Sequence, residues 1–251
     1  MELADILLSK SPDPAWVLES TFAIQQKLLA TSQHIRTANF RSIHTRDLAA
    51  LFALYDQHFF EDRCRQSLAG RKLNFRLAPR MTSNAGTTTR FTNRLTGEVW
   101  FEISIASSLL FDGFGDNDHR GITACGVECE TRLDALQRVF EHESVHLIEH
   151  LCWGESNCSE ARFQTIASTW FLHKSHTHAL ITRRERAAAS GLHPGARVTF
   201  SFEGRSFTGV VNRVTKRATV LVEDPAGLRY SDGKSYVKYY MPLSALELIY
   251  D

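Results

Sequence analysis

Apolar residues recur at helical spacing in several stretches of this chain, and these stretches predict its helices. Residues 1–44 have only a loose apolar face, whereas a well-marked helix follows Thr45, a residue type suited to capping. A long helix should begin near Thr131, which forms a capping-box-like pair with Asp134, and should run to about Trp153-Gly154. Another helix is predicted around residues 163–171.

Stretches of alternating or β-branched residues predict two groups of strands. The first group, at residues 73–77, 87–91 and 99–103, precedes the long helix. The second group, at residues 198–202, 206–211, 218–222 and 236–240, is closely spaced and predicts a small SH3-like barrel. We therefore expect an α+β chain with an N-terminal helical extension at 1–44, a main domain at 45–190 and a barrel at 194–251, with Pro194-Gly195 in the linker.

Composition places the chain among ordinary globular proteins, because 43% of its residues are hydrophobic and 23% are charged. The formal net charge of +1 is too small to attract nucleic acid over the whole surface, so such binding would need a local patch. The N-terminus lacks the pattern of a signal peptide, and no apolar run is long enough to cross a bilayer. An odd number of cysteines, five, favours reduced thiols. These features predict a cytoplasmic protein with no membrane partner.

The strongest chemical signal is the segment His142-Glu143-Ser144-Val145-His146, an HExxH pattern inside the predicted long helix. Histidines four residues apart lie on one helix face, where their imidazoles can share one zinc ion. Glu143 can take a proton from a water molecule that attacks a carbonyl and pass it to the leaving amine. The alternative is a surface helix with scattered His and Glu. It is disfavoured because the apolar residues around the motif would bury it, and unpaired buried polar groups are costly.

The order of segments around this motif resembles that of the SprT-like zinc metallopeptidase family. Residues 51–60 are similar to the family's first helix, residues 73–88 to its first two strands and their Ala-Gly-Thr joint, and residues 102–110 to its third strand. Thr177-His178 is similar to a Thr-His pair that the family carries after its third helix. The resemblance spans residues 45–180. It implies a zincin-like fold with a three-stranded sheet, a zinc cofactor and peptidase activity on protein substrates, which in several members are bound to DNA.

The third zinc ligand departs from the family pattern. Ser159 stands where the family has a histidine, and a neutral hydroxyl is a poor zinc ligand. Cys158 is the first candidate to replace it because thiolates bind zinc strongly, although a small buried apolar role fits this residue equally well. His173 ranks second, but on a continuous helix it would lie about 20 Å away. Glu149, at helical spacing after His146, ranks third. The sequence leaves all three open.

Two further features are weaker metal signals. Cys125 and Cys129 form an isolated pair, without the four-cysteine ribbon that family members often carry, and are predicted to be structural. The loop at 112–118 contains Asp112, Asp116 and Asp118 but lacks the ordered spacing and closing Glu of an EF-hand. A plain polar loop is therefore favoured over a calcium site.

The predicted barrel carries basic and aromatic residues close together, and residues 209–218 are similar to KOW- or Tudor-type modules. Arg213, Lys216 and Arg217 can hold phosphates while tyrosines stack on bases, which would suit DNA or RNA. Acidic residues such as Glu223 and Asp224 dilute this patch. A solvated surface or a protein-binding surface is therefore the alternative.

Three functions are compatible with these features. The first is a zinc-dependent peptidase in which Glu143 is the general base, His142, His146 and Cys158 bind the metal, and the barrel delivers the enzyme to a partner. The second, motivated by the missing histidine, is a non-catalytic nucleic-acid- or protein-binding module on a peptidase-derived scaffold. The third is a metal-dependent hydrolase with a substrate other than a peptide.

Overall fold

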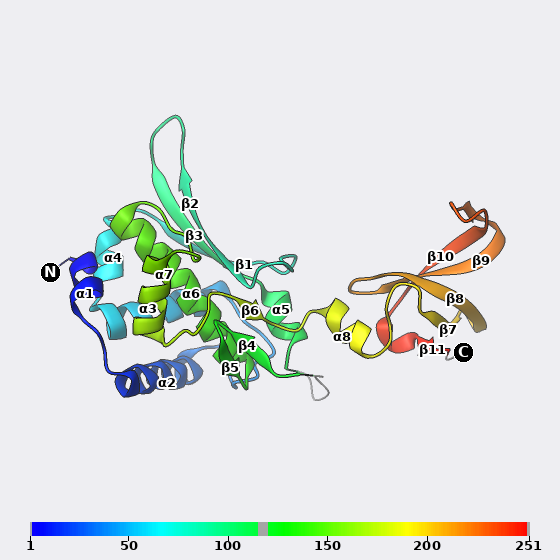
Figure 1. The fold of residues 1–251 in the computed structure, drawn as a ribbon, viewed down its shortest axis with the longest axis horizontal. Helices are drawn as coiled ribbons and strands as arrows, with labels where there is room; N and C mark the ends of the chain where they lie inside the picture. Colours follow the sequence, from blue (N-terminus) through cyan, green and yellow to red (C-terminus); the bar gives the residue numbers. More distant parts are fainter. Residues whose placement is uncertain (1, 115–119, 250–251) are drawn as a thin grey trace. The chain divides into compact units, whose positions relative to one another are not determined.

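A computed structural model describes residues 2–114 and 120–249. Its contacts divide the chain into two units, Met1–Leu180 and Ile181–Asp251. Helices and several small sheets occur together, so the expected α+β class is confirmed (Figure 1). The predicted polar loop at 112–118 lies partly outside the described residues, since 115–119 are not among them. Within the described part of the chain, no helix has the length and apolar character needed to cross a membrane.

The first unit is built around one long helix, α6 (Arg132–Trp153), which contacts strands of both small sheets as well as α3 and α7. Thr131 caps this helix in a capping box with Asp134, and Gly154 ends it in the left-handed conformation, so both predicted ends are confirmed. The other helices of this unit are α1 (Leu3–Ser9), α2 (Pro14–Thr31), α3 (Thr45–Phe60), α4 (Arg63–Leu68), α5 (Ser107–Asp112) and α7 (Ala161–Phe171).

The start of α3 differs in one detail from the prediction. The helix begins at Thr45, but the capping side chain belongs to His44, whose Nδ1 accepts a hydrogen bond from the Arg46 amide at 3.1 Å. His44 and Asp47 form a capping box there. The helix is thus capped by the imidazole of His44 and not, as predicted, by the side chain of Thr45.

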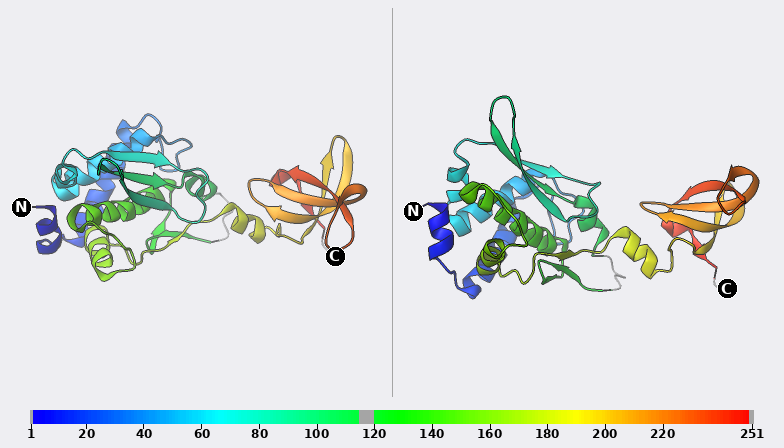
Figure 2. Two further views of the ribbon diagram at one scale, coloured as in Figure 1. Left: turned by 90° about the horizontal axis from the view of Figure 1, so that it is seen from above. Right: turned by 45° about the horizontal axis from the view of Figure 1, so that its top comes forward.

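The three strands predicted before the long helix form one mixed sheet in the order β1-β3-β2. β1 (Leu73–Leu77) runs parallel to β3 (Val99–Ile105), and β2 (Gly86–Thr92) runs antiparallel to it. Figure 2 shows this sheet from two further directions, with α6 beside it. Alternate residues of β3 are fully buried, so this strand supplies the core between sheet and helix.

A second sheet of the first unit was not predicted from the sequence. It has the order β5-β4-β6, with β4 (Ile122–Ala124), β5 (Val127–Cys129) and β6 (His178–Ala179). Strands of two or three residues are too short to show periodicity. In this sheet Ala124 pairs with His178, so the segment after α7 returns to the side of α6.

The second unit contains the four strands predicted after the linker. Together with β11, which was not predicted, they form a five-stranded antiparallel sheet in the order β10-β9-β8-β7-β11, and α8 (Arg183–Ala189) contributes Ala187 to its core. The longest strands, β8 and β9, extend beyond the predicted ranges. The strands are β7 (Arg197–Phe202), β8 (Arg205–Val214), β9 (Ala218–Arg229), β10 (Ser235–Met241) and β11 (Glu247–Leu248), with a 3-10 turn at Leu243–Ala245.

Candidate metal centre

The two histidines of the HExxH motif face one another on α6. Their Nε2 atoms lie 3.2 Å apart, close to the ~3.3 Å edge of a tetrahedral zinc site with two nitrogen ligands. Phe163 of α7 packs against both rings, with ring-centre distances of 4.8 Å to His142 and 4.5 Å to His146. Burial lowers the pKa of His142 to about 2 and that of His146 to about 4. Both rings are therefore neutral at pH 7, the form that binds metal.

Cys158 is brought to these two imidazoles by the connection between α6 and α7. Its thiol and one nitrogen of each histidine all lie within 4.8 Å of one another. The neighbouring Ser159 turns away, since its hydroxyl donates to Oδ1 of Asn157 at 2.8 Å. Burial raises the pKa of the Cys158 thiol, and the charges of Glu143 and Glu149 add to that effect. Cys158 thus remains the predicted third ligand, and a cation would be needed to ionise it.

A short hydrogen-bond chain holds the His146 ring. The Ser156 hydroxyl donates to Oε2 of Glu149 at 2.7 Å and lies 2.7 Å from Nδ1 of His146. Because the carboxylate can only accept, the single hydroxyl proton points to Glu149, and Nδ1 of His146 must donate to Ser156. The proton of the neutral ring is therefore on Nδ1, and Nε2 has a free lone pair for a metal.

Glu149, a candidate ligand in the sequence, therefore acts on His146 through Ser156. Its other carboxylate oxygen accepts from Nε of Arg162 at 2.6 Å, in an ion pair. The Glu149 side chain is fully buried, so this pairing compensates its charge. Glu149 belongs to neither of the two groups of metal-ligating side chains that the described residues form.

Glu143 points from α6 toward β2. Its Oε2 and its backbone oxygen each lie 2.8 Å from the Thr88 hydroxyl. Gly86 makes room for this side chain, because a Cβ there would lie 2.6 Å from Oε1 of Glu143. Burial raises the pKa of Glu143 to about 8, although the bond to Thr88 favours the ionised form. A carboxyl that titrates near neutral pH suits a group that accepts and returns a proton.

His173, the other candidate ligand, is engaged elsewhere. The helix expected to carry it ends at Phe171, and Leu172 turns the chain back in a left-handed conformation. Nε2 of His173 lies 3.0 Å from Oε2 of Glu141 on α6. The same carboxylate pairs with Arg138 at 2.8 Å and accepts from the Tyr55 hydroxyl at 2.5 Å. His173 is therefore part of a buried polar network that links α3, α6 and the segment after α7.

Cys125 approaches the other nitrogen of His142, and His178 lies beside both residues, a placement that the sequence did not predict. The Cys125 sulfur lies 4.0 Å from Nδ1 of His142 and 3.8 Å from Nδ1 of His178. Cys129, predicted like Cys125 to be structural, is buried and contacts the Val127 carbonyl at 3.5 Å. The resemblance had drawn attention to His178 as part of the Thr-His pair, but only the pairing of β6 with β4 brings it here.

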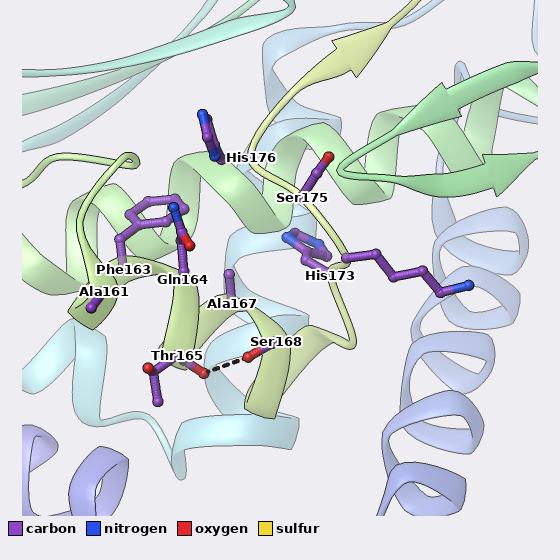
Figure 3. Close-up of a pocket in the computed structure, with 10 residues that line it drawn as sticks. Ala161, Phe163, Gln164, Thr165, Ala167, Ser168, His173, Ser175 and His176 are labelled. Atoms are coloured by element: carbon purple, nitrogen blue, oxygen red, sulfur yellow. Dashed lines mark hydrogen bonds between the residues drawn. The ribbon is translucent and has the colours of Figure 1, made fainter.

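A pocket of about 500 Å³ lies beside this centre. Figure 3 shows its lining, which comes from α7 on one side and from the segment between His173 and His176 on the other. Phe163 belongs both to this lining and to the contacts of His142 and His146. The pocket therefore adjoins the candidate metal centre.

In the second unit, Arg213, Lys216 and Arg217 lie on the hairpin between β8 and β9, and all three are exposed. Most of the tyrosines expected near them are engaged in contacts within this unit. Tyr239 packs on Phe200 and Phe207, and Tyr236 donates to Asp232 at 2.8 Å. Tyr240, however, is 62% exposed.

Comparison of the chain with protein-family models, with curated proteins and with solved structures gives no match. The chemistry of the candidate metal centre therefore follows from the geometry of its own residues. The described part of the chain gathers buried cysteine and histidine side chains that could bind a metal ion around His142.

Proposed function

We propose that this protein is a zinc-dependent peptidase of the SprT-like type, with a zincin-like first unit and an SH3-like second unit. The observation that carries the proposal is the 3.2 Å approach of the two HExxH Nε2 atoms, with the Cys158 thiol beside them. Neutral imidazoles and a thiol are the donors that zinc prefers, so these residues fit this ion. His142, His146 and Cys158 would hold it.

In the proposed mechanism, each residue of the site has one role. When bound, zinc supplies Lewis acidity, which polarises the carbonyl of the peptide bond and makes water reactive near neutral pH. Glu143 accepts the proton of the attacking water and returns it to the nitrogen of the leaving amine. Thr88 holds the carboxyl of Glu143 in position. Ser156 and Glu149 keep Nε2 of His146 unprotonated.

The surroundings of the site favour a protein substrate. The pocket of about 500 Å³ beside Phe163 has room for one or two side chains of an extended peptide. Its lining mixes polar groups such as Gln164 and Ser168 with apolar ones such as Ala167. All five cysteines are free thiols, as expected for a protein of the cytoplasm.

The test compares wild-type protein with Glu143→Gln. Zinc content is measured on the purified chains, and cleavage is measured on casein and on a DNA-bound protein. We expect the variant to keep its zinc and to lose cleavage at least about 100-fold. Glu130→Gln, which changes an exposed carboxyl, is the matched control and should cleave normally. Equal cleavage by wild type and Glu143→Gln would reject the proposed role.

A second candidate function is nucleic-acid binding by the second unit. Thr219 pairs with Arg213 on one side and Tyr240 on the other, so these three side chains form a row on one face of the sheet. An exposed aromatic ring beside a cation can stack on a base while the cation contacts a phosphate. Lys216 and Arg217, at the adjacent turn, add to the local positive charge.

This candidate is tested with single-stranded DNA and RNA at several salt concentrations. The triple variant Arg213→Ala, Lys216→Ala, Arg217→Ala should bind at least about 10-fold more weakly and reduce the salt slope by about 2. Arg205→Ala, at the β7–β8 turn, is the control for loss of one exposed charge. Binding that ignores both the salt concentration and the triple substitution would reject this candidate. Binding without any cleavage would favour the non-catalytic module.

A further inference from the structure

His142 has metal-binding side chains at both of its ring nitrogens. Nε2 faces His146, whereas Nδ1 faces the Cys125 thiol, which in turn lies beside His178. We propose that Cys125, His178 and Nδ1 of His142 form a second binding position for a transition-metal ion of the zinc or cobalt type. We call it the Cys125 position, and we call the position of His142, His146 and Cys158 the HExxH position.

The distances suit a cation. In a tetrahedral zinc site, a sulfur and a nitrogen ligand lie roughly 3.5 Å apart. The Cys125 sulfur lies 4.0 Å from Nδ1 of His142 and 3.8 Å from Nδ1 of His178. All three ligand atoms lie within 4.8 Å of one another, so small rotations of the side chains would close the site. Two imidazoles and one thiolate are the ligand types that Zn²⁺ and Co²⁺ share.

The backbone holds Cys125 and His178 together. The Cys125 amide donates to the Thr177 carbonyl at 2.9 Å, and the Cys125 carbonyl accepts from the amides of Lys174 and Ser175. Ala124 pairs with His178 in the β4–β6 ladder. Both ligands therefore sit on the same small sheet, which contacts α6 and hence the element that carries His142.

The residue type at position 125 is unusual for its turn. Cys125 and Gly126 connect β4 with β5, and both have positive φ, 54° and 70°. Such hairpin turns favour Asn, Asp or Gly at the first of these positions, because a residue with a larger side chain is strained there. A cysteine at this place positions a thiol beside His142. The residues that the turn favours have no thiol.

The two positions share His142 and therefore compete for an ion. A neutral imidazole has one nitrogen with a free lone pair and one that carries hydrogen, so it binds one ion at a time. The Cys125 thiol now donates to the Arg138 carbonyl at 3.4 Å. On binding at the Cys125 position this proton would go to solvent, and the hydrogen on the His142 ring would be on Nε2. An ion held there therefore takes His142 from the HExxH position, which keeps only His146 and Cys158 as ligands.

The test uses Co²⁺ as the probe on the full-length chain, because cobalt bound by a thiolate gives a charge-transfer absorption band. Cys158→Ser removes the thiol of the HExxH position. The Cys158→Ser chain should still show a cobalt–thiolate band, and adding Cys125→Ser should abolish it. Adding Cys129→Ser instead is the matched control and should leave the band unchanged, since this thiol faces the Val127 carbonyl. His178→Gln in the Cys158→Ser chain should weaken cobalt binding at least about 10-fold.

Absence of the band in the Cys158→Ser chain, or its persistence after Cys125→Ser is added, would overturn the proposal. Circular dichroism of each variant shows whether the chain is folded. If the variant that combines Cys158→Ser with Cys125→Ser does not fold, the His178→Gln variant tests the same position. Cobalt binding at the Cys125 position does not depend on peptidase activity. A chain that cleaves nothing can pass this test, and a chain that cleaves casein can fail it.

Discussion

Cys158 and Ser159 are adjacent in the sequence but have different surroundings. The Cys158 thiol faces the two HExxH histidines, whereas the Ser159 hydroxyl caps back onto Asn157. In the proposed metal centre, Cys158 would therefore take the place of the histidine that the resemblance leads us to expect at 159. The sequence could suggest this shift by one residue because thiols are good zinc ligands, but the direction of each side chain depends on the turn at Asn157.

We expect Cys158→Ser to lower the zinc affinity of the HExxH position at least about 10-fold, because a hydroxyl replaces a thiolate. Ser159→Ala should leave the affinity within about a factor of two, and Cys158→His should restore most of it. Competition with a chromophoric chelator measures all three, and cleavage of casein reports the HExxH position alone. If Ser159→Ala were the more damaging substitution, Ser159 rather than Cys158 would be the ligand.

The raised pKa of Glu143 predicts a pH-dependent stability in the metal-free chain. The pKa of the carboxyl is about 8 in the folded chain and near its ordinary value of 4.5 in the unfolded chain, so the folded chain binds the proton more tightly. The free energy of unfolding that Glu143 contributes therefore falls as the pH rises through this window. Glu143→Gln removes this dependence.

In the presence of a chelator, Glu143→Gln should gain stability relative to wild type as the pH rises from 5 to 8, by roughly 3–4 kcal/mol over this range. Other titrating groups are common to both chains and cancel in the difference. Urea unfolding at several pH values measures it. A difference that is constant with pH would contradict the raised pKa.

At the scale of elements, the HExxH helix and β2 fit together through one glycine. Gly86 is the first residue of β2, and a methyl group there would overlap the carboxyl of Glu143. We expect Gly86→Ala to displace Glu143, to reduce cleavage about 100-fold and to destabilise the fold by about 1–3 kcal/mol. Gly121→Ala, whose nearest neighbour would lie at 3.6 Å, is the control. Normal cleavage by Gly86→Ala would show that this close approach is not needed.

The buried network on α6 should contribute strongly to stability. Glu141 is fully buried and compensates the charge of Arg138, which is 11% exposed. We expect Glu141→Ala to lower the free energy of unfolding by about 3–5 kcal/mol, because it leaves Arg138 buried without its counter-charge. The exposed Glu130→Ala should change it by less than about 0.5 kcal/mol. Denaturant unfolding of both variants measures this contribution to the free energy of unfolding.

Elements with a long, regular pattern were predictable from the sequence. The ends of α6 followed from Thr131 and Gly154, and the first strands of the first sheet from alternation in β1 and β-branched residues in β2. The β5-β4-β6 sheet was not predictable, because its strands owe their pairing to the return of the chain after Leu172. Cys125 and His178 meet only through that pairing, so no spacing in the sequence could reveal them.

For the whole molecule, the first 44 residues belong to the same unit as the HExxH helix. Their apolar pattern is loose because Leu18 and Phe22 are exposed while Ile24 and Leu28 are buried. Gln25 of α2 donates to Asp134 on α6 at 2.8 Å. Removing residues 1–44 would thus expose the core that supports the site. Removal of a separate extension would leave that core covered.

The division into two units predicts a selective effect of metal. All four tryptophans lie in the first unit, so their fluorescence reports its unfolding alone. Zinc at about 100 times its dissociation constant should stabilise this unit by ~2.7 kcal/mol, and a chelator should reverse the effect. Calorimetry should detect no corresponding shift for the second unit. A zinc-dependent shift of both units would contradict metal binding confined to the first.

Ser156, which links His146 and Glu149 of α6, lies in the connection between α6 and α7, and this connection also carries Cys158. A single protease cut between Gly154 and Glu160 would therefore release a metal ligand and free the ring of a second one to change its tautomer. Bound zinc would tie both sides of this connection to the helix and shield it. Limited digestion should hence distinguish loaded from empty molecules by the survival of this one segment.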